Sequence, residues 1–257
     1  MKKKKYDLIY SIGRDCACAG YLKKNHLRSF SGPFDWLTNA GFEKRFELLL
    51  NDFSDFMDPK DFKFLPKNPN IFNDSNCDYY ENVKTTFYYY HDFPINVPFD
   101  QVFDSISEKY SRRIKRFYEK IKTSEKVLLV WFSHYHDTPD EIVVNLCNQF
   151  CTKMQKEIDF LIIEHKNGCS EPIAEKLTAN ITRYKLHTIV LDSNNNPTTF
   201  GDIELCNKIF QNFQLKMPFS LKCKRQFFKI ISEIVCIWFF NKESRKKIRK
   251  KIREYYE

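Results

Sequence analysis

The sequence predicts an α/β protein with a mostly parallel sheet and helices on both faces, a Rossmann-like three-layer arrangement, followed by C-terminal amphipathic helices. In the second half of the chain, short apolar segments alternate with helical ones, which is typical of a parallel sheet. These segments are continuously apolar, as in strands that are buried on both faces. With 257 residues, 42% hydrophobic and 16% aromatic, the chain can build a substantial core, and this composition excludes a disordered protein.

The first part of the chain predicts a strand, a tight turn and a helix. The apolar run Tyr6–Ile12 is closed by Gly13, and helix-compatible residues follow over Cys16–Asn25. A second helix is expected over Gly41–Asp52, and the aromatic run Phe87–His91 predicts a strand.

A long amphipathic helix is predicted over Phe99–Lys122, because its apolar residues recur on one helical face. The alternation that follows consists of strand Lys126–Phe132, helix Pro139–Lys156, strand Ile158–Glu164, helix Glu171–Ala179, strand His187–Leu191 and helix Asp202–Phe213. Ligands of such sheets bind beyond the carboxyl ends of the strands. We therefore expect Gly13 to Cys16, His134 to Asp137, His165 and Asp192 at one edge.

The net charge of +9 is concentrated in the last 40 residues. Residues 218–257 contain twelve Lys and Arg against four Asp and Glu, a net +8, and the other 217 residues carry only +1. The sequence thus predicts a nearly neutral α/β domain over residues 1–217 and a basic tail over 218–257. A neutral body argues against nucleic-acid binding.

The tail has the pattern of an anchor that lies in the plane of a membrane. Gln226–Phe240 is apolar but shorter than the roughly 20 residues that a membrane span requires. The basic segment Ser244–Arg253 follows it, so we expect residues 222–257 to bind an anionic membrane surface. The alternative is a helix packed on the body with solvated charges. Nine Cys without paired spacing, and no apolar run after the N-terminal lysines, favour the cytoplasm, so the expected location is the inner membrane face.

Cys16 is the first candidate for covalent chemistry. It follows a strand and a glycine turn at a predicted helix start, where free N–H groups, the helix dipole and Arg14 favour a thiolate. A cysteine nucleophile also needs a base and a group that orients it. His91, followed by Asp92, is a candidate base, and Asp35 is a second candidate carboxylate. The alternatives are a small buried cysteine, a core histidine and a helix cap.

Metal and nucleotide cofactors are not expected. His134, His136 and Asp137 have an H-x-H pattern that suits a metal, but no further ligand pair at suitable spacing follows. The chain has no G-x-G-x-x-G, no Walker loop and no Asp-x-Asp. The cluster Arg112, Arg113 and Arg116 suits a phosphate or carboxylate, or is a solvated helix face.

Several of these segments together resemble a bacterial domain family catalogued as putative papain-like cysteine peptidases. The segments are SIGRDC (11–16), LRSFSGPFDWL (27–37), NDF (51–53), YHDF (90–93) and RRI (112–114), and the resemblance covers roughly residues 6–200. It implies a catalytic Cys16 and His91 with Asp92 or Asp35 as third member. The candidates for substrate binding are then Gly13, Arg14, Trp36, Arg112, Arg113 and Arg116. A papain-type fold would pair a helical half with an antiparallel barrel, whereas the alternation predicts a parallel sheet.

Three functions follow as hypotheses. The first is a cysteine-dependent hydrolase or acyl transferase that acts near the inner membrane face on a peptide or a lipid-linked glycan. The second is a metal-independent glycosyltransferase or related enzyme of bacterial cell-surface polysaccharide synthesis, because the tail is similar to those of such enzymes. In that enzyme His91 or an Asp would be the base, and Arg113 or Arg116 would bind the donor phosphates. The third is a membrane-recruited binding module.

Overall fold

The computed structural model describes residues 3–54, 56–67, 76–136, 138–193, 195, 197–216, 219–237, 241, 244–245, 248–249 and 252. The chain divides into two compact units. The first comprises Met1–Arg28 and Gly32–Leu215, and the second comprises Ser29–Ser31 and Lys216–Glu257. The units are described separately below.

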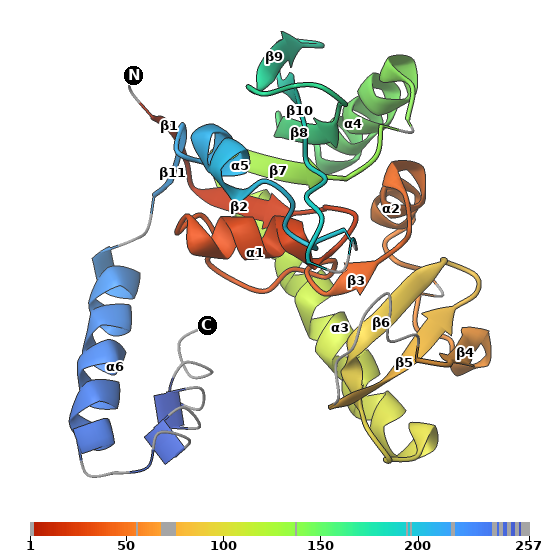
Figure 1. The fold of residues 1–257 in the computed structure, drawn as a ribbon, viewed down its shortest axis with the longest axis vertical. Coiled ribbons are helices and arrows are strands. Elements are labelled where there is room, and N and C mark those ends of the chain that lie inside the picture. The colour runs from red at the N-terminus through yellow and green to blue at the C-terminus, as the bar shows by residue number, and fades with distance from the viewer. Residues whose placement is uncertain are drawn as a thin grey trace. The chain divides into compact units, whose positions relative to one another are not determined.

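The main sheet of the first unit has the order β2-β7-β8-β10-β9 (Figure 1). Four strands are parallel: β2 (Leu8–Ser11), β7 (Val127–Phe132), β8 (Asp159–His165) and β10 (Ile181–Leu186). All six residues of β7 are buried, which explains its continuously apolar sequence. The edge strand β9 (Ile173–Lys176) is antiparallel to β10.

Helices cover both faces of this sheet. Neighbouring residues of a strand point to opposite faces, and Trp131 and Phe132 of β7 show which helix lies on which face. Trp131 contacts Phe42 of α2 (Phe42–Leu50), and α2 packs on α4 (Asp140–Met154). Phe132 contacts Tyr21 of α1 (Cys16–Lys24), which also stacks on Phe210 of α5 (Ile203–Phe210).

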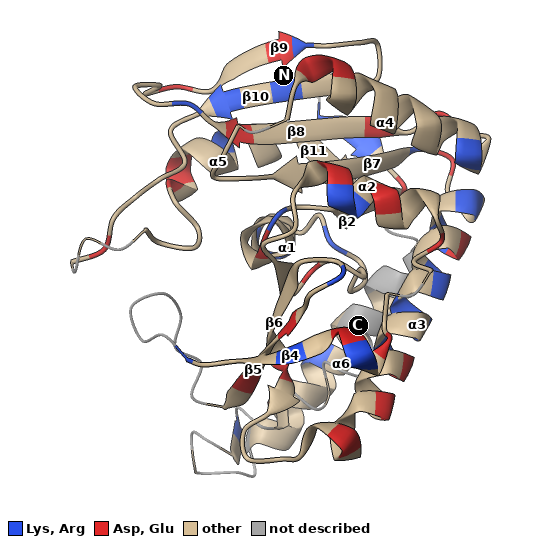
Figure 2. Cartoon of the chain, turned by 90° about the vertical axis from the view of Figure 1, so that its right-hand side faces the viewer, with Lys and Arg blue, Asp and Glu red and all other residues tan. Residues whose placement is uncertain are grey.

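A second sheet is wholly antiparallel, with the order β3-β6-β5-β4. Its strands are β3 (Leu37–Thr38), β4 (Phe62–Leu65), β5 (Cys77–Asn82) and β6 (Phe87–Pro94), with a 3-10 turn, η1 (Pro59–Asp61), before β4. The long helix α3 (Phe99–Thr123) runs along β6 and buries Phe103, Ile106 and Tyr110. Figure 2 shows charges of both signs along α3. A short parallel pair, β1 (Lys4–Tyr6) and β11 (Phe213–Leu215), completes the described sheets.

The expected fold class is therefore correct only in part. The protein is a mixed α/β protein with several sheets, of which one is wholly antiparallel and one has an antiparallel edge. Two predicted elements are wrong: Glu171–Ala179 contains β9 instead of a helix, and the strand expected at His187–Leu191 is β10 at Ile181–Leu186. The polar sequence of β10 concealed it, because its fully buried Arg183 forms an ion pair inside the protein.

The second unit contains α6 (Phe219–Ile237), which overlaps the helix expected over Gln226–Phe240. The basic helix expected over Ser244–Arg253 and the residues 238–240 lie largely outside the described part of the chain. Within that part, no helix has the length and hydrophobicity to cross a membrane.

Candidate functional site

The carboxyl ends of β2, β7, β8 and β10 lie at one edge of the main sheet, because these four strands are parallel. The amide of Arg14 donates to the carbonyl of Phe132 (2.9 Å), so the loop after β2 runs beside the loop after β7. The Arg14 guanidinium lies 4.5 Å from the centre of the Tyr135 ring. The structure therefore places Arg14, Asp15 and Cys16 next to the segment that carries His134 and His136.

Cys16 is half-buried and is the first residue of α1. Asp15 caps this helix, with Oδ1 accepting from the Ala17 amide at 2.8 Å. Burial raises the pKa of the Cys16 thiol to about 12, and the negative charge of Asp15 adds to the rise. The thiolate expected at this helix start is thus not favoured, and the resting thiol is protonated at neutral pH.

The close packing around Gly13 explains why the turn before Cys16 contains a glycine. A Cβ at position 13 would lie 2.3 Å from the Cys18 Cβ, closer than real side chains approach. Buried Arg45 fixes the same turn from α2, because its Nη2 donates to the carbonyls of Arg14 (2.7 Å) and Leu37 (3.0 Å). Since Leu37 belongs to β3, Arg45 ties the antiparallel sheet to the loop of Cys16.

His91 stands on β6 of the antiparallel sheet, and its ring meets Trp36 edge-on with centroids 5.5 Å apart. The adjacent Asp92 accepts from the Tyr110 hydroxyl (2.7 Å) and forms an ion pair with Lys109. Asp92 is only 3% exposed, and both partners belong to α3. Its described contacts therefore fasten β6 to α3.

Asp35 is buried, and one of its two carboxylate oxygens is held by residues of the block that contains it. Its Oδ2 accepts from the Gly32 amide (3.0 Å) and pairs with Arg28 (2.8 Å). Burial raises the pKa of Asp35, whereas Arg28 and then Arg113 and Arg116 oppose the rise. Two of the candidate arginines thus direct their charge at Asp35 from α3.

Arg112 has a different environment from Arg113 and Arg116. It is paired with Glu108 at 3.5 Å, and the two side chains are 68% and 75% exposed. This is an exposed i,i+4 pair of a solvated helix face, of the kind that contributes little to stability.

His134 belongs to a hydrogen-bonded chain across the sheet edge. Its Nδ1 lies 3.0 Å from Thr188 Oγ1, and its Nε2 lies 2.9 Å from the Thr199 carbonyl oxygen and 3.9 Å from Asp15 Oδ2. The same Thr188 meets His165 through its amide and its hydroxyl (3.0 and 3.2 Å). Because the Thr199 carbonyl only accepts, Nε2 of His134 donates to it, and in the neutral ring Nδ1 then accepts from the Thr188 hydroxyl.

His136 points to a different partner. Its Nδ1 lies 2.7 Å from Oε2 of Glu164, a fully buried residue at the end of β8. Arg183 of β10, also fully buried, places its Nε 3.2 Å from the same oxygen and pairs through Nη1 with Asp140. The two histidines of the H-x-H pattern do not converge, and the described residues contain no group of three or more His, Cys, Asp or Glu that could hold a metal ion. Asp137 lies outside the described residues.

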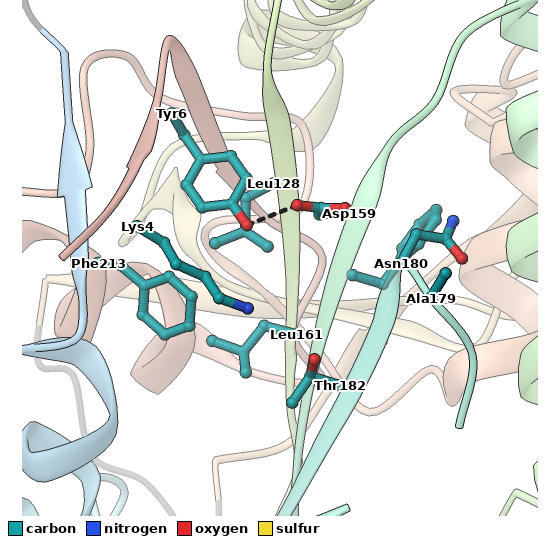
Figure 3. A pocket seen from close by; sticks show the side chains of 10 residues that line it. Lys4, Tyr6, Leu128, Asp159, Leu161, Ala179, Asn180, Thr182 and Phe213 are labelled. Atoms are coloured by element: carbon teal, nitrogen blue, oxygen red, sulfur yellow. Dashed lines mark hydrogen bonds between the residues drawn. The ribbon is translucent and has the colours of Figure 1, made fainter. Parts of the chain in front are cut away.

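Two hollows are lined by described residues of the main-sheet unit. An open one of about 520 Å³ lies at the carboxyl edge, beside β8 and the start of α5. It is lined by Gly168, Cys169, Ser170, His187, Asp202, Glu204, Leu205 and Lys208. The other, at the opposite end of the strands, has only about 20 Å³ and lies where Tyr6 donates to Asp159 at 2.6 Å (Figure 3). That volume holds about one water molecule. The larger hollow has the room for a small molecule, but neither Cys16 nor His91 is among the residues that line it.

Sequence reasoning missed Glu164 and Arg183. The signal was present, because Glu164 directly follows the apolar run Phe160–Ile163, and a charge there must find a partner when it is buried. The expected edge residues Gly13 to Cys16, His134 and His165 are brought to one edge, whereas His91, Asp92 and Trp36 belong to the antiparallel sheet and the segment that precedes it.

Comparison with known proteins gives one family. The model of the family described as "Putative papain-like cysteine peptidase (DUF1796)" matches residues 7–168. This segment contains Cys16, His91, His136 and Glu164 and ends before β10. No curated protein and no solved structure matches the chain significantly.

Proposed function

We propose that this chain, which belongs to the family described as putative papain-like cysteine peptidases, is a cysteine-dependent hydrolase or acyl transferase with Cys16 as its nucleophile. The observation that carries the proposal is the place of Cys16, which is the first residue of α1 at the carboxyl edge of the main sheet. The first main-chain N–H groups of a helix have no partner within the helix, and those that the Asp15 cap does not use can stabilise the oxyanion of an acyl-transfer intermediate.

The protonated thiol defines what the site must do. Because the pKa of Cys16 is raised to about 12, a base must accept the thiol proton as the sulfur attacks the carbonyl carbon of the substrate. We propose that His91 of the YHDF segment is this base and that it then returns the proton to the leaving group. Asp92 and Asp35 contribute through the scaffold, because Asp92 binds Tyr110 of α3 next to His91, and Asp35 binds Arg28 next to Trp36, whose ring contacts His91.

The test is substitution of the nucleophile. We expect Cys16→Ala to abolish hydrolysis of acyl esters, thioesters and fluorogenic peptides, and to abolish acyl labelling of the protein as measured by mass spectrometry. Cys223→Ala, which removes an exposed cysteine of α6, is the control and should keep wild-type activity. If the correctly folded Cys16→Ala protein remains as active as the wild type, the proposal is wrong. Retained glycosyl transfer in that variant would favour the polysaccharide-synthesis alternative.

A second proposal concerns the place of action. We propose that the tail binds an anionic membrane surface, so that the enzyme meets a lipid-linked glycan or peptide substrate there. The support is the apolar face of α6, where Phe227, Ile230 and Ile234 are 60%, 54% and 53% exposed at helical spacing. Such a face beside many Lys and Arg is typical of helices that lie in a membrane interface.

A further inference from the structure

His136 has the geometry of an acid–base residue that the proposed function does not yet use. Its side chain is 42% exposed, while its Nδ1 is held by fully buried Glu164. A carboxylate only accepts hydrogen bonds, so Nδ1 carries a proton and Nε2 is the basic nitrogen of the neutral ring. A histidine oriented by a carboxylate behind it is the arrangement of the general base in a catalytic triad.

The buried ion pair that holds His136 in place costs free energy of folding. Glu164 and Arg183 are both 0% exposed and form an ion pair inside the protein. Taking two charges out of water costs more than a buried pair usually returns, and apolar residues of similar size would often stabilise a core better. Arg183 in turn pairs with Asp140 at the start of α4, so three elements fix the position of the Glu164 carboxylate. A surface histidine without a role needs no such support.

The location connects this pair with Cys16. His136 follows Tyr135, whose ring contacts the Arg14 guanidinium, and Cys16 lies two residues beyond Arg14. The thiol and the imidazole are thus carried by adjacent loops at the edge where ligands of parallel sheets bind. We propose that His136 is a catalytic residue for the second half of the reaction, the hydrolysis of the acyl group from Cys16, and that Glu164 is its positioning residue. This inference rests on the proposed role of Cys16.

The step is a general-base hydrolysis of a thioester. Nε2 of His136 takes a proton from water while the water oxygen bonds to the acyl carbon. The carbon–sulfur bond then breaks, the sulfur of Cys16 receives the proton from Nε2, and the carboxylic acid leaves. Bond formation, bond cleavage and proton transfer balance without a further reactant.

The experiment uses the full chain and 4-nitrophenyl acetate as the probe. In His136→Ala we expect a rapid release of about one equivalent of nitrophenol, then turnover slowed by about 100-fold or more, with an acetyl group found on Cys16 by mass spectrometry. Added imidazole should restore turnover. His26→Asn, which changes an exposed histidine at φ 58°, is the matched control and should match the wild type.

Glu164→Gln tests the positioning role. The deshielded proton resonance of the Nδ1–H bond should be lost in this variant and in His136→Ala, and acetyl-Cys16 should accumulate to an intermediate level. Since Glu164→Gln changes a buried ion pair and can impair folding, His136→Ala is decisive. If His136→Ala turns over like the wild type and accumulates no acetyl-Cys16, the inference about His136 is wrong, but the proposed role of Cys16 stands. A wild-type nitrophenol burst in Cys16→Ala would overturn the proposed function.

Discussion

At the scale of single residues, the structure shows that several candidate catalytic side chains make contacts that stabilise the fold. The SGPFDWL block also stabilises the fold. Its Asp35 forms an ion pair with Arg28, and the positive charges of Arg113 and Arg116 on α3 stabilise the Asp35 carboxylate. Cys16, Asp35 and Asp92 became candidates from residue type and position alone, and their catalytic roles stay predictions. The partners of the acidic side chains were not identifiable, because a sequence does not show that Asp92 meets Tyr110 or that Glu164 meets His136.

The protonation state of Cys16 gives a residue-scale prediction. With its pKa raised to about 12, the thiol stays protonated at pH 8, whereas an ordinary cysteine with a pKa near 8.5 is partly ionised. We expect iodoacetamide to label Cys16 at least about 100-fold more slowly than exposed Cys223 at pH 8, as measured by peptide mass spectrometry. Labelling of Cys16 should keep accelerating with pH toward 12.

The opposite outcome would be informative. If Cys16 is the fastest-labelled cysteine at pH 7, its thiolate is stabilised in solution and no base is needed for the attack. The alkylated peptide also reports whether Cys18 reacts, which we do not expect, because that thiol is buried and donates to the Val130 carbonyl.

At the scale of elements, strong periodicity was sufficient for the helices and for the buried strands. The predicted ranges for α3, α4 and β7 agree with the structure to within a few residues, because each has one continuous apolar face or run. The antiparallel sheet was not recognised, since aromatic residues occupy both faces of β6 and hide its alternation. β10 was missed because a charged residue, Arg183, occupies a buried position of this strand, where an ion pair with Glu164 compensates its charge.

The loop after β10 gives an element-scale prediction. Gly201 has φ 58°, and a Cβ there would lie 1.6 Å from the Thr188 carbonyl oxygen. Gly201→Ala must therefore push the loop away from Thr188 and disturb the hydrogen bonds of His134. We expect a loss of about 2–4 kcal/mol in the free energy of unfolding, measured with urea.

Gly168→Ala is the matched control for this substitution. Gly168 has φ 72°, so alanine meets the same backbone strain, but nothing lies within 4 Å of its Cβ position. Its cost should be about 1–2 kcal/mol. Equal losses in the two variants would show that the loop yields without cost and that it does not hold His134 in place.

At the scale of the whole molecule, the sequence shows that the positive charge is concentrated in the C-terminal tail, but it does not show what the tail binds. A net charge of +9 would indicate a nucleic-acid binder if it were spread evenly. Divided between residues 1–217 and 218–257, it leaves a nearly neutral α/β body and a basic tail. The family model also ends at residue 168, so the tail is a property of this chain outside the matched segment.

The last prediction separates the two forces that would hold the tail on a membrane. Each Lys or Arg near an anionic surface contributes about 1 kcal/mol, and this attraction weakens with salt, whereas the burial of apolar side chains does not. The full chain should therefore cosediment with vesicles containing phosphatidylserine, and deletion of residues 222–257 should release it at physiological salt. The triple variant Phe227→Ser, Ile230→Ser and Ile234→Ser keeps every charge, so it should bind at low salt and detach at physiological salt. If the deleted form still cosediments, the tail is not the anchor. If the triple variant binds like the wild type at every salt concentration, the apolar face of α6 does not enter the membrane, and charge alone holds the tail there.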